Sequence, residues 1–147
     1  MKLEKINADI VKKYYKGDGR FMVGAYNTER IGITYDGIVM YIISLEDWLY
    51  DTSKLLKGGE TTSQIPRMVN DALDGSLDAV LTGVMVAQDK KTLYELKTEK
   101  FNVYIDSGFL RNFDKVCTFK CKSPKSPVVV YEGENLAGFI LPVLYKK

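Results

Sequence analysis

The sequence predicts an α+β fold for a single domain of 147 residues. The order of one strand, one helix and three further strands can be traced twice, over residues 1–44 and over residues 100–147. Residues 45–99, which separate these two units, show helical and hairpin patterns. We therefore expect two βαβββ units joined by a partly helical insertion. The units repeat in pattern and not in residue identity.

The first unit is expected to open with a short strand at residues 2–5 and to continue as a helix. Asn7 suits the N-cap of that helix, because its side-chain oxygen can accept a hydrogen bond from a free backbone N–H. The glycines at positions 17 and 19 predict the end of the helix. Its apolar stripe is expected to consist of Ile10, Val11, Tyr14 and Tyr15.

Three strands should follow that helix, over residues 20–26, 30–35 and 38–44. Their β-branched and aromatic side chains favour extended structure. Asn27 separates the first two strands. Asp36-Gly37 predicts a hairpin between the last two, because this pair tolerates the positive φ angles of a tight turn.

The insertion is expected to begin with a helix over residues 45–56 that ends at Lys57-Gly58-Gly59. The stripe of this helix would consist of Leu45, Trp48, Leu49, Leu55 and Leu56. Trp48 is expected to be a packing aromatic, and the alternative is an exposed anchor for a partner protein.

A second helix in the insertion is expected from residue 65 to residue 73. Pro66 lies in its first turn, where the missing N–H removes no helical hydrogen bond. Asp74-Gly75 should end it. Residues 79–87 and 92–97 then predict a hairpin around Asp89-Lys90-Lys91.

The second unit should contain a strand over residues 101–105 and a short helix between Asp106 and Asp114. The remaining strands are expected over residues 116–121, 128–131 and 136–143, and Pro142 closes the last of them. The stripe of the short helix consists of Phe109, Leu110 and Phe113.

Composition excludes several classes of function. The chain has no histidine, which removes the usual general base and the commonest metal ligand. Cys117 and Cys121 lie too far apart along their predicted strand to form a disulfide. No apolar run approaches the roughly 20 residues of a membrane span, and no signal peptide is evident. We therefore expect a cytoplasmic protein with no enzymatic activity, no cofactor and no metal site.

Two segments carry a resemblance to a known family. FNVYIDSGFLRNF, which begins with the pair Phe101-Asn102, and SPVVVYEGENLAGFILPVL resemble the closing segment of the bacterial DNA polymerase sliding clamp, or β clamp. The resemblance covers residues 100–144. Clamp subunits hold three such domains in one chain, whereas 147 residues can hold one. A small clamp relative of a phage or mobile element would fit this length.

The resemblance implies a DNA-clamp-like domain with both unit helices on one face of a curved antiparallel sheet. In that family the helices face the DNA backbone, and an apolar cleft near the terminal strands captures short linear motifs of replication proteins. The residues that would contact duplex DNA are Lys12, Lys13, Lys16, Arg111 and Lys115. The residues that would bind a partner peptide are Val128, Phe139, Leu141 and Val143.

The function implied is that of a non-enzymatic processivity factor in DNA replication that assembles as a homo-oligomer. A net charge of +2 is too small to indicate DNA binding by itself, so the expectation depends on where the lysines lie. Two alternatives stay open. One is an adaptor that has the clamp fold, binds a partner protein and does not encircle DNA; the other is an unrelated α+β domain.

Overall fold

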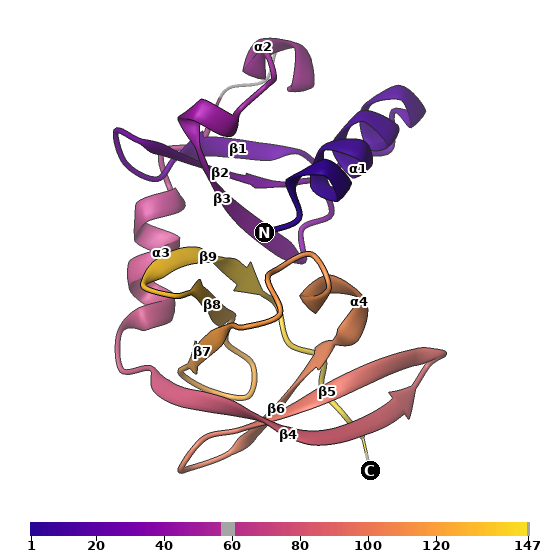
Figure 1. The fold of residues 1–147 in the computed structure, drawn as a ribbon, viewed down its shortest axis with the longest axis vertical. Coiled ribbons are helices and arrows are strands. Elements are labelled where there is room, and N and C mark those ends of the chain that lie inside the picture. Colours follow the sequence, from indigo (N-terminus) through magenta and orange to yellow (C-terminus); the bar gives the residue numbers. More distant parts are fainter. Residues whose placement is uncertain (57–60, 147) are drawn as a thin grey trace.

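The computed structural model describes residues 1–56 and 61–146 (Figure 1). Its strands form one open antiparallel sheet in the order β1-β2-β3-β9-β8-β7-β4-β5-β6. The strands are β1 (Met22–Ala25), β2 (Arg30–Thr34), β3 (Val39–Ser44), β4 (Leu77–Gln88), β5 (Lys91–Lys97), β6 (Asn102–Asp106), β7 (Thr118–Cys121), β8 (Val128–Glu132) and β9 (Asn135–Ile140). The helices are α1 (Leu3–Lys16), α2 (Thr52–Leu55), α3 (Ile65–Leu73) and α4 (Ser107–Leu110), with a 3-10 turn at Leu45–Asp47.

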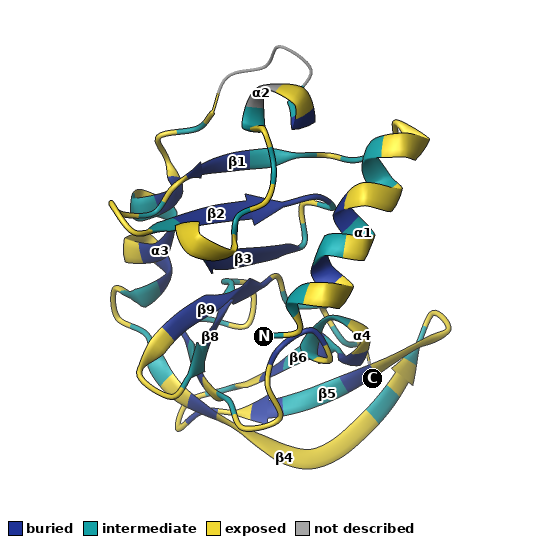
Figure 2. Cartoon of the chain, turned by 45° about the horizontal axis from the view of Figure 1, so that its top comes forward, coloured by how far each residue is buried: buried dark blue, intermediate teal, exposed yellow. Residues whose placement is uncertain are grey.

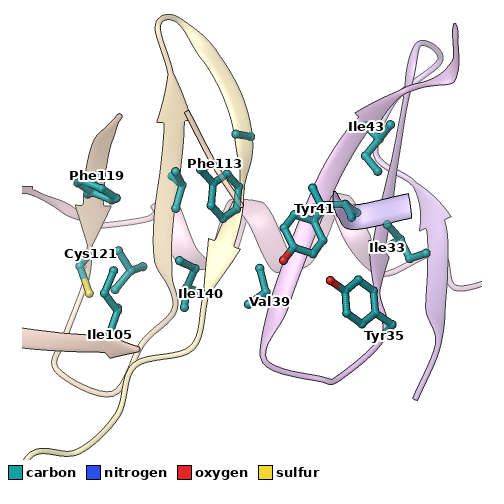
Figure 3. Close-up of a cluster of buried hydrophobic side chains, with 14 of the residues drawn as sticks. Ile33, Tyr35, Val39, Tyr41, Ile43, Ile105, Phe113, Phe119, Cys121 and Ile140 are labelled. Carbon is teal, nitrogen blue, oxygen red and sulfur yellow. The ribbon is translucent and has the colours of Figure 1, made fainter. Parts of the chain in front are cut away.

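Helices cover both faces of the sheet. Because side chains alternate along a strand, β3 directs Tyr41 to one face and Ile42 to the other. On the Tyr41 face, α1 contributes Ile6 and Ile10 to a large buried cluster, and partly buried side chains of α4 pack against the same cluster. Figure 3 shows part of this cluster. On the Ile42 face, α3 contributes Ile65, Val69 and Ala72 to a second cluster.

The first and last thirds of the chain meet in the middle of the sheet. Strand β3 pairs with β9, with Val39 opposite Ile140 and Tyr41 opposite Gly138. Figure 3 shows the side chains of Val39 and Ile140 close together across this junction. Strands from the first and last thirds of the chain therefore lie side by side in one continuous sheet.

Strand β4 is long and bent. Leu77, Asp78 and Ala79 pair with β7, and the residues paired with β5 are Val80, Leu81, Met85, Val86, Ala87 and Gln88. The register with β5 shifts between Leu81 and Met85, and this bulge changes the direction of the strand. As a result, β4, β5 and β6 extend away from the remaining strands, and most of β4 is exposed (Figure 2).

The predicted strand at residues 2–5 is wrong, because α1 begins at Leu3. Asn7, the predicted N-cap, lies inside this helix. The helical spacing of Ile6 and Ile10 extends the apolar stripe toward the N-terminus, and both side chains are fully buried. Two residues of the predicted stripe, Val11 and Tyr15, are instead exposed.

The predicted helix over residues 45–56 is also wrong. A 3-10 turn is followed by extended backbone at Trp48, and only the single turn of α2 is helical. Trp48 packs edge-to-face on Tyr50, whose hydroxyl donates to Asn7 of α1 at 3.1 Å. These tertiary contacts turn both rings toward the core, so they outweigh the local helical spacing. The predicted stop at Lys57-Gly58-Gly59 lies outside the described residues.

The other predicted elements are confirmed within a few residues. Gly17 ends α1 in the left-handed conformation, and Asp36 Oδ1 accepts the backbone N–H groups of Ile38 and Val39 in the predicted turn. Helix α3 has the predicted bounds. The remaining strands of both units and the β4–β5 hairpin also lie where they were expected. Helix α4 is a single turn capped by Asp106, which accepts from the Gly108 N–H.

Candidate nucleic-acid interface

A hollow of about 510 Å³ lies between α1 and α4. Asp9 and Tyr35 belong to its lining, and Phe109 and Asn112 come from α4 and the residues after it. The lysines of α1 that line it are Lys5, Lys12, Lys13 and Lys16. Separations of four and seven residues place Lys5, Lys12 and Lys16 on one side of the helix. One helix therefore presents a basic row at the rim of this hollow.

The three carboxylates in the hollow are already engaged by the protein. Asp9 accepts a hydrogen bond from the Tyr35 hydroxyl at 3.0 Å. Asp36 accepts backbone N–H groups in the hairpin turn, and Asp106 caps α4. By contrast, none of the four lysines forms an ion pair with a residue in the described part of the chain. Within the described residues the ammonium groups are thus free of ion pairs, while the three carboxylates keep their negative charge in the same hollow.

A buried polar network supports the floor of the hollow. Asn112 Nδ2 donates to the Tyr41 hydroxyl at 2.6 Å, and the Tyr35 and Tyr41 hydroxyls interact with each other. Burial raises the pKa of Tyr35 above its ordinary range, and its electrostatic and hydrogen-bond interactions with Tyr41 and Asp9 add to this effect. Burial also raises the pKa of Tyr41. Both phenols therefore stay neutral near pH 7, and the network is structural.

The structure brings only part of the predicted DNA-binding set together. Lys12 and Lys16 are exposed and Lys13 is half-buried, and all three line the hollow. Arg111 and Lys115 are exposed but do not line it. Sequence reasoning missed Lys5, because residues 2–5 were expected to form a strand. Its separation of seven residues from Lys12 is the signal that could have found it.

The predicted partner-peptide residues do not form one surface. Val128 is fully buried in the cluster beneath α1, and Phe139 is buried in the cluster beneath α3, on the opposite face of the sheet. Leu141 is exposed just beyond β9. Val143 is half-buried, and its N–H donates to the Tyr104 carbonyl at 2.8 Å. The first two side chains pack the core, and the last two belong to the C-terminal segment.

Three other kinds of feature are relevant to function in the described part of the chain: a metal site, a reactive thiol and a membrane-spanning helix. Within it, no group of His, Cys, Asp and Glu side chains is arranged to hold a metal ion. Burial raises the pKa of the Cys117 thiol to about 11, so this thiol is protonated and weakly nucleophilic near pH 7. Within residues 1–56 and 61–146, no helix is both long enough and apolar enough to span a bilayer.

Comparisons with known proteins give no relative. No family model, no curated protein and no solved structure matches the chain. A function is therefore proposed from the chain itself, starting from the lysine row at the hollow between α1 and α4.

Proposed function

We propose that this chain is a non-enzymatic, sliding-clamp-like module that contacts the backbone of duplex DNA through the lysines of α1. The contacts would be made to phosphates and would carry no sequence preference. Such a module would act in DNA replication, holding partner proteins near the duplex.

The basic row on α1 is the observation that carries this proposal. Lys5, Lys12 and Lys16 lie on one side of a rigid helix, and Lys13 joins them at the hollow. Their ammonium groups have no carboxylate partner within the described residues, whereas the neighbouring aspartates accept hydrogen bonds from the chain. The hollow is lined by four ammonium groups and three carboxylates, so a phosphate that approached α1 would meet a small excess of positive charge.

The arrangement of helices is consistent with the clamp-like part of the proposal. Both α1 and α4 pack on the same face of the sheet. A clamp-like domain needs its unit helices on the face directed at DNA. The β3–β9 pairing joins strands of the two proposed units, although β4 and β5 lie between β6 and β7 of the second unit.

Salt-dependent binding to duplex DNA tests the proposal. Replacing Lys12, Lys13 and Lys16 together by Gln should weaken binding to a duplex of arbitrary sequence. It should also flatten the plot of log affinity against log salt, by about 0.9 for each phosphate that the lysines no longer neutralise. The matched control replaces three exposed lysines outside the hollow together by Gln: Lys97, Lys100 and Lys125. This variant loses the same amount of charge.

Two results would overturn the proposal. The first is no duplex binding by the unmodified protein at about 50 mM salt, which would favour the adaptor alternative. The second is an equal loss of affinity in the control variant, since binding would then follow overall charge and not the α1 row.

A further inference from the structure

Strand β4 has an unusual surface for an exposed strand. The residues from Ala79 to Ala87 include no charged side chain. Several large apolar side chains on the strand are open to solvent, and Figure 2 shows nearly the whole strand as exposed. The exposed fractions are 67% for Val80, 41% for Leu81, 46% for Val84 and 62% for Met85. Because neighbouring side chains alternate, both faces of the strand are apolar.

One edge of β4 also has free backbone groups. Asp89 and Lys90 have positive φ angles of 51° and 65°, so they form the tight two-residue turn that makes Gln88 and Lys91 a hydrogen-bonded pair. Hydrogen-bonded and non-hydrogen-bonded pairs alternate in an antiparallel ladder. The N–H and C=O groups of Met85 and Ala87 consequently point away from β5. No backbone group within residues 1–56 and 61–146 pairs with them.

The two outer strands of the sheet, β1 and β6, differ from β4 because another part of the chain donates a hydrogen bond to a backbone carbonyl at the edge of each. On β1, the Val23 carbonyl accepts the N–H of Thr62 at 2.9 Å. On β6, the Tyr104 carbonyl accepts the N–H of Val143 at 2.8 Å. Proteins usually protect such edges with loops, charges or proline. Among the described residues, the C-terminal segment contacts the outer part of β4 through the Gln88 side chain, and no backbone group pairs with the outward-pointing N–H and C=O groups of Met85 or Ala87. This uncharged edge is therefore suited to pair with another strand.

We propose that this edge pairs with the β4 edge of a second copy of the chain, in an antiparallel and symmetric way. A twofold axis at Val86 places Met85 of each copy opposite Ala87 of the other. These are the two residues whose backbone groups point outward, so both sets of hydrogen bonds are satisfied. No other register centred on a residue of this segment matches both outward residues.

The side chains favour a second copy over a strand of mixed polarity. In this register, Val86 faces Val86, Val84 faces Gln88, and no charged side chain opposes another. A strand that is apolar on both faces is best matched by a partner that is also apolar on both faces, and β4 is such a strand. Asp89 and Lys90 of one copy lie beside Gly83 and Thr82 of the other, which are uncharged. The proposal does not depend on DNA binding.

Light scattering across a concentration series, combined with a charge exchange, tests the pairing. The unmodified protein should show a concentration-dependent mass that approaches twice that of the single chain. M85E/A87E should raise the dimer dissociation constant by at least about tenfold, because the carboxylates introduced at the two positions then face each other across the axis. M85E/A87K should restore the dimer, because opposite charges then face each other. Both positions are exposed, so the fold should tolerate these changes.

Leu49→Glu is the matched control, since it adds negative charge at an exposed apolar residue outside β4, and the dimer should persist. Circular dichroism of each variant checks that the fold is retained. A protein that stays monomeric up to about 200 μM, far above the dissociation constants of specific dimers, overturns the proposal. A dimer that M85E/A87E leaves intact, or that M85E/A87K fails to restore, also overturns it. The same is true if β4 captures a different polypeptide while the chain alone is monomeric.

Discussion

The Asn112 amide donates a hydrogen bond of 2.6 Å to the Tyr41 hydroxyl, and this contact joins the two halves of the chain inside the core. Tyr41 lies on β3, and its ring also packs against Phe113 at a centroid distance of 5.5 Å. Asn112 follows α4, and its carbonyl accepts the N–H of Lys2 at the start of α1. One residue thus fixes the sheet, α4 and the start of α1 in relation to each other.

Replacement of Asn112 by Ala should lower the free energy of unfolding by about 1 to 2 kcal/mol. The loss of the bond to Tyr41 destabilises the fold, but Asn112 Oδ1 has no hydrogen-bond partner among the described residues, and its removal offsets part of this cost. Urea denaturation measures the change. The control is Asn135→Ala, an exposed position where a change within about 0.5 kcal/mol is expected. Equal effects of the two variants would contradict a role for the buried bond.

Stability should fall at alkaline pH, and Tyr35 should account for part of the fall. Burial raises the pKa of Tyr35, so the folded protein keeps the phenolic proton above about pH 10, where the unfolded chain loses it. The unfolded state then binds fewer protons, and stability decreases as the pH rises. The contribution of Tyr35 to the free energy of unfolding is fully present below about pH 10 and is lost progressively as the pH rises above that value.

Tyr35→Phe should therefore flatten the alkaline slope of the free energy of unfolding, by up to about 1.4 kcal/mol per pH unit. Urea titrations between about pH 9 and pH 11, which span the ordinary tyrosine pKa, measure this slope. Tyr15→Phe is the control, because its ring is 81% exposed and the slope should not change. The prediction fails if Tyr35→Phe leaves the slope as steep as it is in the unmodified protein.

Much of the sheet could be predicted from the sequence, because its signals are local. Strands β2 and β3 are rich in β-branched residues, and Asp36-Gly37 supplies the turn between them. Helix α3 combines Pro66 in its first turn with an apolar stripe. For such segments, local preference and tertiary packing agree.

The errors occur where tertiary contacts override the local pattern. The apolar residues around Trp48 have the spacing of a helix. In the structure, however, the rings of Trp48 and Tyr50 pack together and the backbone at Trp48 is extended. The pairing of β3 with β9 could not be derived from periodicity either, since the two strands are about a hundred residues apart. The candidate site depends on this long-range arrangement, because α4 lies beside α1 only once β3 has paired with β9.

Gln88 should control the order of the C-terminal segment. Its side chain binds the backbone at two points: Nε2 donates to the Leu144 carbonyl at 3.0 Å, and Oε1 accepts the Lys146 N–H at 2.8 Å. Gln88→Ala removes both hydrogen bonds, so the Lys146 amide should exchange with solvent about five to ten times faster. Amide exchange followed by NMR measures the rate.

Gln88→Glu separates the two hydrogen bonds. It retains an acceptor for the Lys146 N–H but has no donor for the Leu144 carbonyl. Exchange at Lys146 should therefore be slower than in Gln88→Ala. If the Lys146 amide exchanges at the same rate in the unmodified protein and in Gln88→Ala, the Gln88 side chain does not hold this segment in solution.

Gly138 should be among the least replaceable residues of the sheet. It lies opposite Tyr41 in the β3–β9 pair with a φ of 156°, a backbone conformation that side chains with a Cβ rarely adopt. A Cβ built there would lie 2.0 Å from the Met40 carbonyl oxygen, so β9 would have to move away from β3. Gly138→Ala should lower the free energy of unfolding by about 3 kcal/mol or more. Gly75→Ala is the control: its φ is also positive, but its Cβ would meet nothing within 4 Å, so a cost of about 1 kcal/mol is expected. Urea denaturation compares the two variants, and a cost at Gly138 no larger than at Gly75 would show that β3 and β9 are not packed this closely in solution.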